Sequence, residues 1–197
     1  MRPGHPLFTL LPVLLVLSFG QAAATPRVVA SIAPLYSLAS AVMEGAGAPQ
    51  LLLQGGESPH TFSLRPSEAR MLNEADVLFW VGPQLEMPLA RILPNLPKTR
   101  SVPLIDTPGL QLLPVPDLDP DPAHADAESA IHEGPHAGSA AAVDPHIWLS
   151  PANAAVIADN ITRVLAELDP AQAPRYRSNA KRLQQQLAAL DLDLRRQ

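Results

Sequence analysis

Short apolar runs alternate with amphipathic stretches through the first part of this chain. Four of the runs have the length and composition of buried strands, at residues 28–32, 50–53, 76–81 and 101–105. Between them, apolar side chains recur at the three- and four-residue spacing of a helix, and Pro34 and Pro66 suit a first helical turn. This order predicts an α/β fold with a small parallel four-stranded sheet flanked by helices.

Two of the runs indicate their place in that sheet. Residues 77–81 read Val-Leu-Phe-Trp-Val, so both faces of the strand are apolar, as in the middle of a parallel sheet. Pro103 interrupts the last run, and a proline cannot donate a hydrogen bond to a neighbouring strand. We therefore expect residues 101–105 at an edge of the sheet.

Helical periodicity returns after Ser150 and continues to the last residue. Ser150 and Pro151 suit the start of a helix that ends before Pro170. A longer helix begins near Pro174 and reaches Gln197 with a leucine-rich seam and no glycine or proline to end it. We expect the chain to stop inside this long helix, as a truncated form of a larger protein.

The first 24 residues have the features of a cleavable signal peptide. Arg2 gives a short positive start, residues 7–19 form an apolar segment, and the alanines at 22–24 suit cleavage after Ala24. A membrane anchor is the alternative, but the apolar segment is short and Pro12 interrupts it. The chain contains no cysteine. These features predict export to the periplasm as a soluble protein.

The charge balance limits the classes of partner. The full chain has 14 basic and 19 acidic residues, and loss of Arg2 with the signal peptide leaves 13 − 19 = −6. Nucleic acids and anionic membranes require a basic patch, so we expect neither as a partner. A cationic ligand fits this charge better.

Residues 106–143 differ in composition from the sequence on either side. They are rich in proline, alanine and acidic residues, lack lysine and arginine, and include His124, His132 and His136. Such a segment cannot build a core, so we predict a flexible insertion between an α/β lobe at 25–105 and the end of that lobe at 144–197. Two interpretations stay open: a solvated acidic linker, or a loose trap for divalent metal ions.

Two histidines outside the insertion are the candidate metal ligands. His60 lies in the turn between the second predicted strand and the following helix, and His146 lies just before the helix that starts at Pro151. A neutral imidazole on a loop at the carboxyl end of a strand can reach a binding cleft. Histidine suits Zn²⁺, whereas Mn²⁺ favours more carboxylate oxygens, so we predict zinc in preference to manganese.

The sequence also resembles a known family. Residues 57–67, Glu-Ser-Pro-His-Thr-Phe-Ser-Leu-Arg-Pro-Ser, are similar to the first ligand motif of the periplasmic zinc- and manganese-binding proteins of ABC uptake systems. Residues 76–82 with Glu86 resemble the strand that follows this motif. Residues 144–151, Asp-Pro-His-Ile-Trp-Leu-Ser-Pro, resemble the second ligand motif, and an acidic insertion with histidines between the two motifs is typical of the zinc-uptake branch.

The resemblance implies one lobe of a two-lobe protein that captures zinc and delivers it to a permease in the inner membrane. It assigns His60 and His146 as ligands, places the remaining ligands in a second lobe, and implies a monomer when the protein is complete. Some members carry a ligating carboxylate directly before the first histidine. That position is Pro59 here, and Glu57 is left unassigned.

Two other functions are weighed against zinc uptake. A zinc-dependent hydrolase needs a general base beside the metal, but the sequence has no H-E-x-x-H motif, and only Glu57 and Asp144 lie near the two histidines. We therefore expect a binding protein rather than an enzyme. The other alternative is an incomplete gene product that binds metal weakly, because two ligands fall short of the three or four that zinc takes in proteins.

Overall fold

A computed structural model describes residues 25–54, 56–96, 98–115 and 143–196. The predicted signal peptide at 1–24 lies outside these residues. So do His124, His132 and His136, with most of the predicted insertion.

A four-stranded parallel sheet lies at the centre of the fold. Its strands stand in the order β2-β1-β3-β4, and every neighbouring pair is parallel. Their bounds are β1 (Val28–Ala30), β2 (Gln50–Leu51), β3 (Val77–Trp80) and β4 (Arg100–Pro103). The four strands and the parallel sheet predicted from the apolar runs are confirmed.

The places of β3 and β4 follow from their side chains. All four residues of β3 are buried, and the strand pairs with β1 on one side and β4 on the other. β4 lies at the edge of the sheet, as Pro103 predicted. The strand is shorter than expected, because Leu104–Asp106 turn into a short 3-10 helix, η2.

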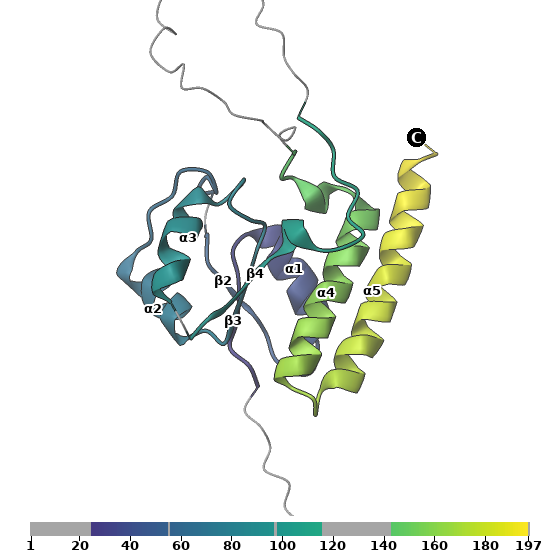
Figure 1. Cartoon of the computed structure of the whole chain (residues 1–197). Helices are drawn as coiled ribbons and strands as arrows, with labels where there is room; N and C mark the ends of the chain where they lie inside the picture. Colours follow the sequence, from purple (N-terminus) through teal and green to yellow (C-terminus); the bar gives the residue numbers. More distant parts are fainter. Residues whose placement is uncertain (1–24, 55, 97, 116–142, 197) are drawn as a thin grey trace, which may run out of the picture.

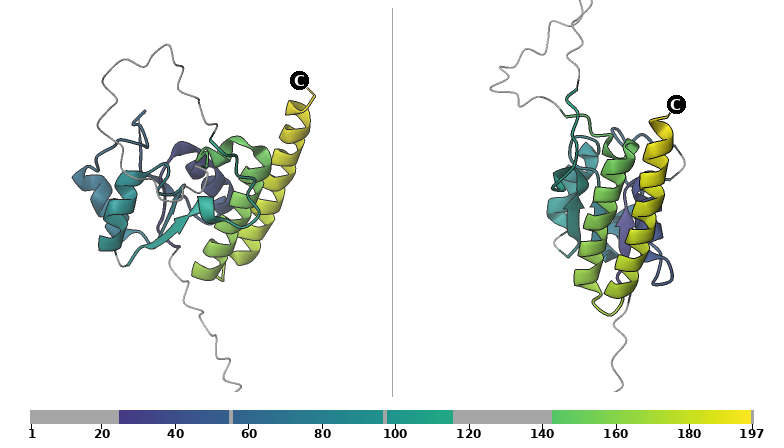
Figure 2. Two further views of the ribbon diagram at one scale, coloured as in Figure 1. Left: turned by 45° about the horizontal axis from the view of Figure 1, so that its top comes forward. Right: turned by 90° about the vertical axis from the view of Figure 1, so that its right-hand side faces the viewer.

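Helices cover both faces of the sheet (Figures 1 and 2). On one face lie α2 (Pro66–Glu74) and α3 (Met87–Ile92), which the short helix η1 (Leu93–Asn95) extends. On the other face lie α1 (Ala33–Met43), α4 (Pro151–Leu168) and α5 (Ala173–Leu194). The last two form an antiparallel pair at the outside of the lobe, and no helix in the described part of the chain is long and apolar enough to cross a membrane.

Local sequence signals explain where several helices begin. Pro66 occupies the first turn of α2, and the Glu68 carboxylate accepts a hydrogen bond from the Arg65 backbone N–H at 2.7 Å. The Ser150 hydroxyl accepts a hydrogen bond from the Asn153 N–H at 3.4 Å and caps α4, as the sequence predicts.

Hydrogen bonds join the first half of α5 to the end of α1. The Asn179 side-chain amide donates to the backbone carbonyls of Val42 and Glu44, each at 2.9 Å. Arg175 donates to the Gly45 carbonyl at 2.6 Å. We call these contacts the α1–α5 clamp. They satisfy carbonyl groups that the end of α1 leaves without partners inside the helix.

A buried carboxyl group joins the carboxyl ends of β1 and β3. Glu86 is fully buried and accepts hydrogen bonds from the Ser31 hydroxyl at 2.5 Å, the Val81 N–H at 3.2 Å and the Gly82 N–H at 3.0 Å. Burial raises the pKa of Glu86 above its ordinary range, and the three hydrogen bonds act in the opposite direction.

Residues 106–115, which begin the predicted insertion, lie against α4. Asn160 donates to the Thr107 hydroxyl at 2.9 Å, and Asn153 exchanges two hydrogen bonds with the backbone of Gln111. Pro114 and Val143 then form an isolated antiparallel bridge, which brings the two ends of the insertion together. The domain boundaries at 105 and 143 stay predictions.

Candidate metal centre

The two predicted ligands lie side by side, although 86 positions separate them in the sequence. The imidazole rings of His60 and His146 have centroids 6.4 Å apart and planes inclined by 57°. Two imidazoles that bind one Zn²⁺ with Zn–N distances of about 2.0 Å place their centroids roughly 5 Å apart. A small movement of the His60 loop would therefore bring both rings to one ion.

Each histidine lies on a short segment at the carboxyl edge of the sheet. His60 belongs to a turn between β2 and α2, and His146 immediately precedes the 3-10 helix η4 (Ile147–Leu149). Parallel strands bring their carboxyl ends to one edge, and the loops that follow them meet there. This explains why two motifs so far apart in sequence meet in space.

An open pocket of about 390 Å³ contains both histidines. Its walls are mainly apolar and come from the start of α1, the end of β2, the His60 loop and Trp148. Trp148 also packs edge-on against the His146 ring, with centroids 5.3 Å apart. The two imidazoles and the Glu57 side chain are thus the polar groups of a largely apolar hollow, an arrangement typical of small-ligand sites.

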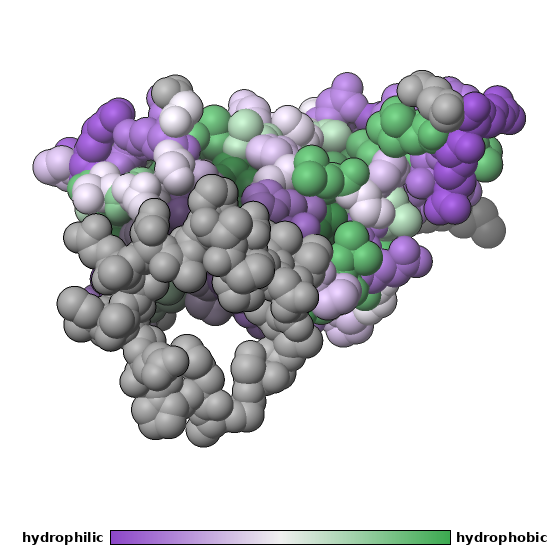
Figure 3. Space-filling view, turned by 90° about the horizontal axis from the view of Figure 1, so that it is seen from above, coloured by the Kyte–Doolittle hydropathy of each residue, from purple (hydrophilic) through white to green (hydrophobic). Residues whose placement is uncertain are grey.

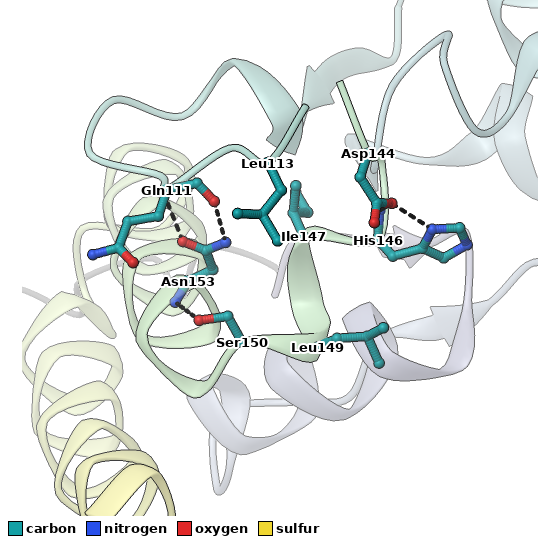
Figure 4. A pocket seen from close by; sticks show the side chains of 8 residues that line it. All are labelled: Gln111, Leu113, Asp144, His146, Ile147, Leu149, Ser150 and Asn153. Carbon is teal, nitrogen blue, oxygen red and sulfur yellow. Dashed lines mark hydrogen bonds and ion pairs between the residues drawn. The ribbon is translucent and has the colours of Figure 1, made fainter. Parts of the chain in front are cut away.

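Asp144 fixes the orientation of the His146 ring. One carboxylate oxygen, Oδ1, lies 2.6 Å from Nδ1 of His146 and 2.9 Å from its backbone N–H (Figure 4). An ionised carboxylate only accepts hydrogen bonds, so Nδ1 carries the proton and Nε2 keeps a free lone pair for a metal ion. The hydrogen bonds from the backbone and ring of His146 lower the pKa of Asp144, which keeps this partner charged.

Glu57 supplies a carboxylate to the wall of this pocket. Its Oε1 accepts a hydrogen bond from Arg65 at 2.6 Å, whereas Oε2 is buried without a hydrogen-bond partner among the described residues. Within the same residues, no three histidine, aspartate or glutamate side chains gather closely enough to hold a metal ion. The described chain thus brings two imidazoles together, whereas a tetrahedral zinc site takes four ligands.

Several separate apolar patches lie on the face where the strands end. Figure 3 shows this face from above, with apolar side chains gathered over the end of α5 and elsewhere on the face. The large apolar side chains that stay exposed among the described residues include those in the segment 112–115, in η4 and at the end of α5, namely Leu112, Leu113, Val115, Leu149, Leu190, Leu192 and Leu194.

The sequence indicates the two histidines as candidates but not the groups that hold them. Asp144 was noted only as a nearby acid, and its spacing of two from His146 was the available signal. Asn153 gave no signal, because its partner Gln111 lies 42 positions earlier in the chain.

The family described as "ZnuA: Zinc-uptake complex component A periplasmic" matches residues 28–197. The chain belongs to the ZnuA family. This family assignment covers both histidine segments, the sheet and α5, and it confirms the resemblance inferred from the motifs.

Curated ZnuA relatives are similar over most of this chain. The High-affinity zinc uptake system protein ZnuA of Brucella abortus (strain 2308) is 36% identical over 184 residues, which cover 83% of this chain and 55% of the relative. The protein of the same name from Paracoccus denitrificans is 34% identical and covers 88% and 57%. The chain thus spans about half the length of the curated ZnuA relatives that it matches.

Solved structures show the same fold at lower identity. Zn(II)-bound AdcA from Streptococcus pneumoniae matches with a TM-score of 0.65 at 21% identity, over 86% of this chain and 32% of that one. A Mn-bound periplasmic metal binding protein from candidatus liberibacter asiaticus matches with a TM-score of 0.64 at 21% identity, over 82% and 52%. The four-stranded lobe is therefore a known ZnuA-like architecture.

Proposed function

We propose that this chain is the zinc-capturing component of an ABC-type uptake system in the periplasm, with His60 and His146 as metal ligands. The observation that carries the proposal is the meeting of the two imidazoles in one pocket, with centroids 6.4 Å apart. Relatives named as high-affinity zinc uptake proteins support it. The captured ion would pass to a permease in the inner membrane.

Zinc is the preferred ion on chemical grounds. Neutral imidazole binds Zn²⁺ well, and affinity for a nitrogen site falls steeply from Zn²⁺ to Mn²⁺. Manganese is the alternative, since a similar fold is described with bound Mn. A competition titration of Mn²⁺ against Zn²⁺ on the isolated chain shows which of the two ions it binds more tightly.

We propose binding without chemical turnover. Of the two carboxylates near the histidines, Asp144 holds His146, and Glu57 pairs with Arg65 through Oε1 while its Oε2 is buried without a partner among the described residues. A hydrolase requires a general base free to take a proton from metal-bound water. The family description, a component of an uptake complex, agrees with a binding role.

The proposal is tested by zinc titration calorimetry on the chain after removal of residues 1–24. With two protein ligands we expect one zinc per chain, bound more weakly than in a closed four-ligand site. His60→Ala and His146→Ala should each weaken zinc binding by more than roughly a hundredfold. Removing a hydrogen-bond partner of a metal ligand costs up to about a hundredfold in affinity, and removing the ligand itself costs more.

His132→Ala is the matched control, because it removes an imidazole from the insertion and leaves the pocket intact. It should preserve the affinity of this site. Unchanged zinc affinity in His60→Ala or His146→Ala would overturn the assignment of the ligands.

A further inference from the structure

Asn153, in the first turn of α4, is nearly fully buried, and its side chain binds a segment of chain outside its own helix. Its Oδ1 accepts a hydrogen bond from the Gln111 N–H at 2.8 Å, and its Nδ2 donates to the Gln111 carbonyl at 3.0 Å. One amide side chain thus satisfies both backbone groups of one residue (Figure 4). We call this pair of hydrogen bonds the Asn153 clip.

The clip fixes the segment on which Asp144 rests. Two residues after Gln111, the Leu113 carbonyl accepts a hydrogen bond from the Asp144 N–H at 2.8 Å. Pro114 and Val143 pair beside it as an antiparallel bridge. The backbone of Asp144 is therefore placed by a strand segment that is itself fastened to α4.

Packing alone does not hold the candidate ligand. The side chains of Asp144 and His146 are each 43% exposed, so nearby atoms enclose them only in part. Trp148 packs edge-on against the ring, and the hydrogen bonds from the His146 backbone and ring to Asp144 Oδ1 are the polar contacts that orient it. A pocket of about 190 Å³, which both residues line together with Gln111, Leu113 and Asn153, leaves room for the ring to move if Asp144 shifts.

From this chain of contacts we propose that Asn153 is a positioning residue for His146. It acts through Gln111, the Leu113 carbonyl and Asp144, and it keeps the Nε2 lone pair of His146 directed for metal binding. The inference rests on the proposed function, in which His146 is a ligand. Outer partners of metal ligands typically contribute about 10- to 100-fold to metal affinity. Asn153 acts on such a partner, Asp144, through the segment from Gln111 to Leu113.

Asn153→Asp is the informative variant. It keeps an acceptor for the Gln111 N–H and places a negative charge in the first turn of α4, which favours the helix. It replaces the Nδ2 donor by an oxygen that faces the Gln111 carbonyl, so the clip is broken on one side. Asn160→Asp is the matched control, because Asn160 also lies on α4 and donates to the earlier segment at Thr107, away from Asp144.

The first readout needs no metal. Long-range ¹H–¹⁵N NMR at about pH 8, above the ordinary histidine pKa of about 6.5, reports which ring nitrogen carries the proton. We expect His146 protonated on Nδ1 in the wild-type chain and in Asn160→Asp, and a mixture of both tautomers in Asn153→Asp. The His60 signals should stay unchanged in all three proteins and serve as an internal reference.

The second readout is zinc affinity by calorimetry, which we expect to fall roughly tenfold in Asn153→Asp and to stay unchanged in Asn160→Asp. A folded Asn153→Asp protein with unaltered His146 ring signals would overturn the positioning role. A wild-type chain that bound no zinc would overturn the proposed function instead, while a change of the His146 tautomer in Asn153→Asp would still support the positioning role.

Discussion

Glu86 is the residue whose burial has the clearest energetic consequence. It is an acidic side chain enclosed at the carboxyl ends of β1 and β3, and it accepts hydrogen bonds from Ser31, Val81 and Gly82. Gly82 has a φ of +148°, and a Cβ there would lie 2.8 Å from Ile105, so the backbone at this corner accepts little change.

Replacing Glu86 by alanine should lower the free energy of unfolding by about 3 kcal/mol. The change leaves two buried backbone N–H groups and a hydroxyl without their partner, and each unsatisfied group carries a cost. Urea denaturation measures the effect. Glu74→Ala, an exposed acid at the end of α2, is the control and should change stability by less than about 0.5 kcal/mol.

The raised pKa of Glu86 predicts a particular pH dependence. The folded chain holds the Glu86 proton more tightly than the unfolded chain does, so this residue favours folding most below its ordinary pKa of 4.5. That contribution falls as the pH rises through the folded-state pKa. Glu86→Gln does not titrate, so the stability of wild type relative to this variant should decrease from about pH 4 upward.

Urea denaturation of both proteins over a pH series tests this. Groups that titrate in both chains cancel in the difference. A wild-type advantage that grew with rising pH would contradict the raised pKa.

Some of these residues could be predicted from the sequence, and others could not. The positions of His60 and His146 beside element boundaries could be predicted, because such positions follow from local sequence, whereas their role as metal ligands stays a prediction. The roles of Glu86 and Asn153 depend on partners far along the chain, such as Ser31 and Gln111. Side-chain hydrogen bonds of this kind are set by tertiary packing, which a local pattern does not contain.

At the scale of elements, the α1–α5 clamp determines how the last helix is held. Asn179 is buried and satisfies two carbonyls at the end of α1. Leu190, Leu192 and Leu194, at the far end of α5, are exposed. The helix is thus fastened at one end and presents apolar side chains at the other.

Asn179→Leu should destabilise the chain by about 2 kcal/mol, because the Val42 and Glu44 carbonyls lose their donor in a partly buried position. Thermal or urea unfolding followed by circular dichroism measures the loss. Arg163→Ala is the comparison, since Arg163 forms an exposed ion pair with Glu167 that contributes less than about 1 kcal/mol. An equal loss of unfolding free energy in Asn179→Leu and Arg163→Ala would show that the α1–α5 clamp contributes little to stability.

The elements themselves were largely predictable. The apolar runs gave all four strands, and Pro103 correctly placed β4 at the edge. The end of β4 was wrong by two residues, because Leu104 and Ile105 are buried in a 3-10 turn as completely as they would be in a strand. A buried strand and a buried 3-10 turn both require apolar residues, so the sequence of these two residues does not distinguish them.

At the scale of the whole molecule, we predict that the candidate metal pocket does not depend on the insertion. Pro114 pairs with Val143, so the chain between them starts and ends at one point beside Asp144. We expect that replacing residues 117–142 by a short glycine-serine linker leaves zinc affinity at His60 and His146 unchanged. Calorimetry also gives the number of zinc ions bound, which decides between the two interpretations of the insertion.

A drop in the number of weakly bound zinc ions would identify the insertion as a metal trap. An unchanged number would identify it as a solvated linker. Loss of the site at His60 and His146 would contradict the separation of pocket and insertion.

The bridge between Pro114 and Val143 has a consequence for how such proteins can diverge. The free energy of closing a loop rises by only about 0.6 kcal/mol for each doubling of its length. With the two ends already joined, residues can be gained, lost or exchanged in between while the imidazole of His146 stays where it is. Evolution can therefore change the insertion without rebuilding the lobe that carries it.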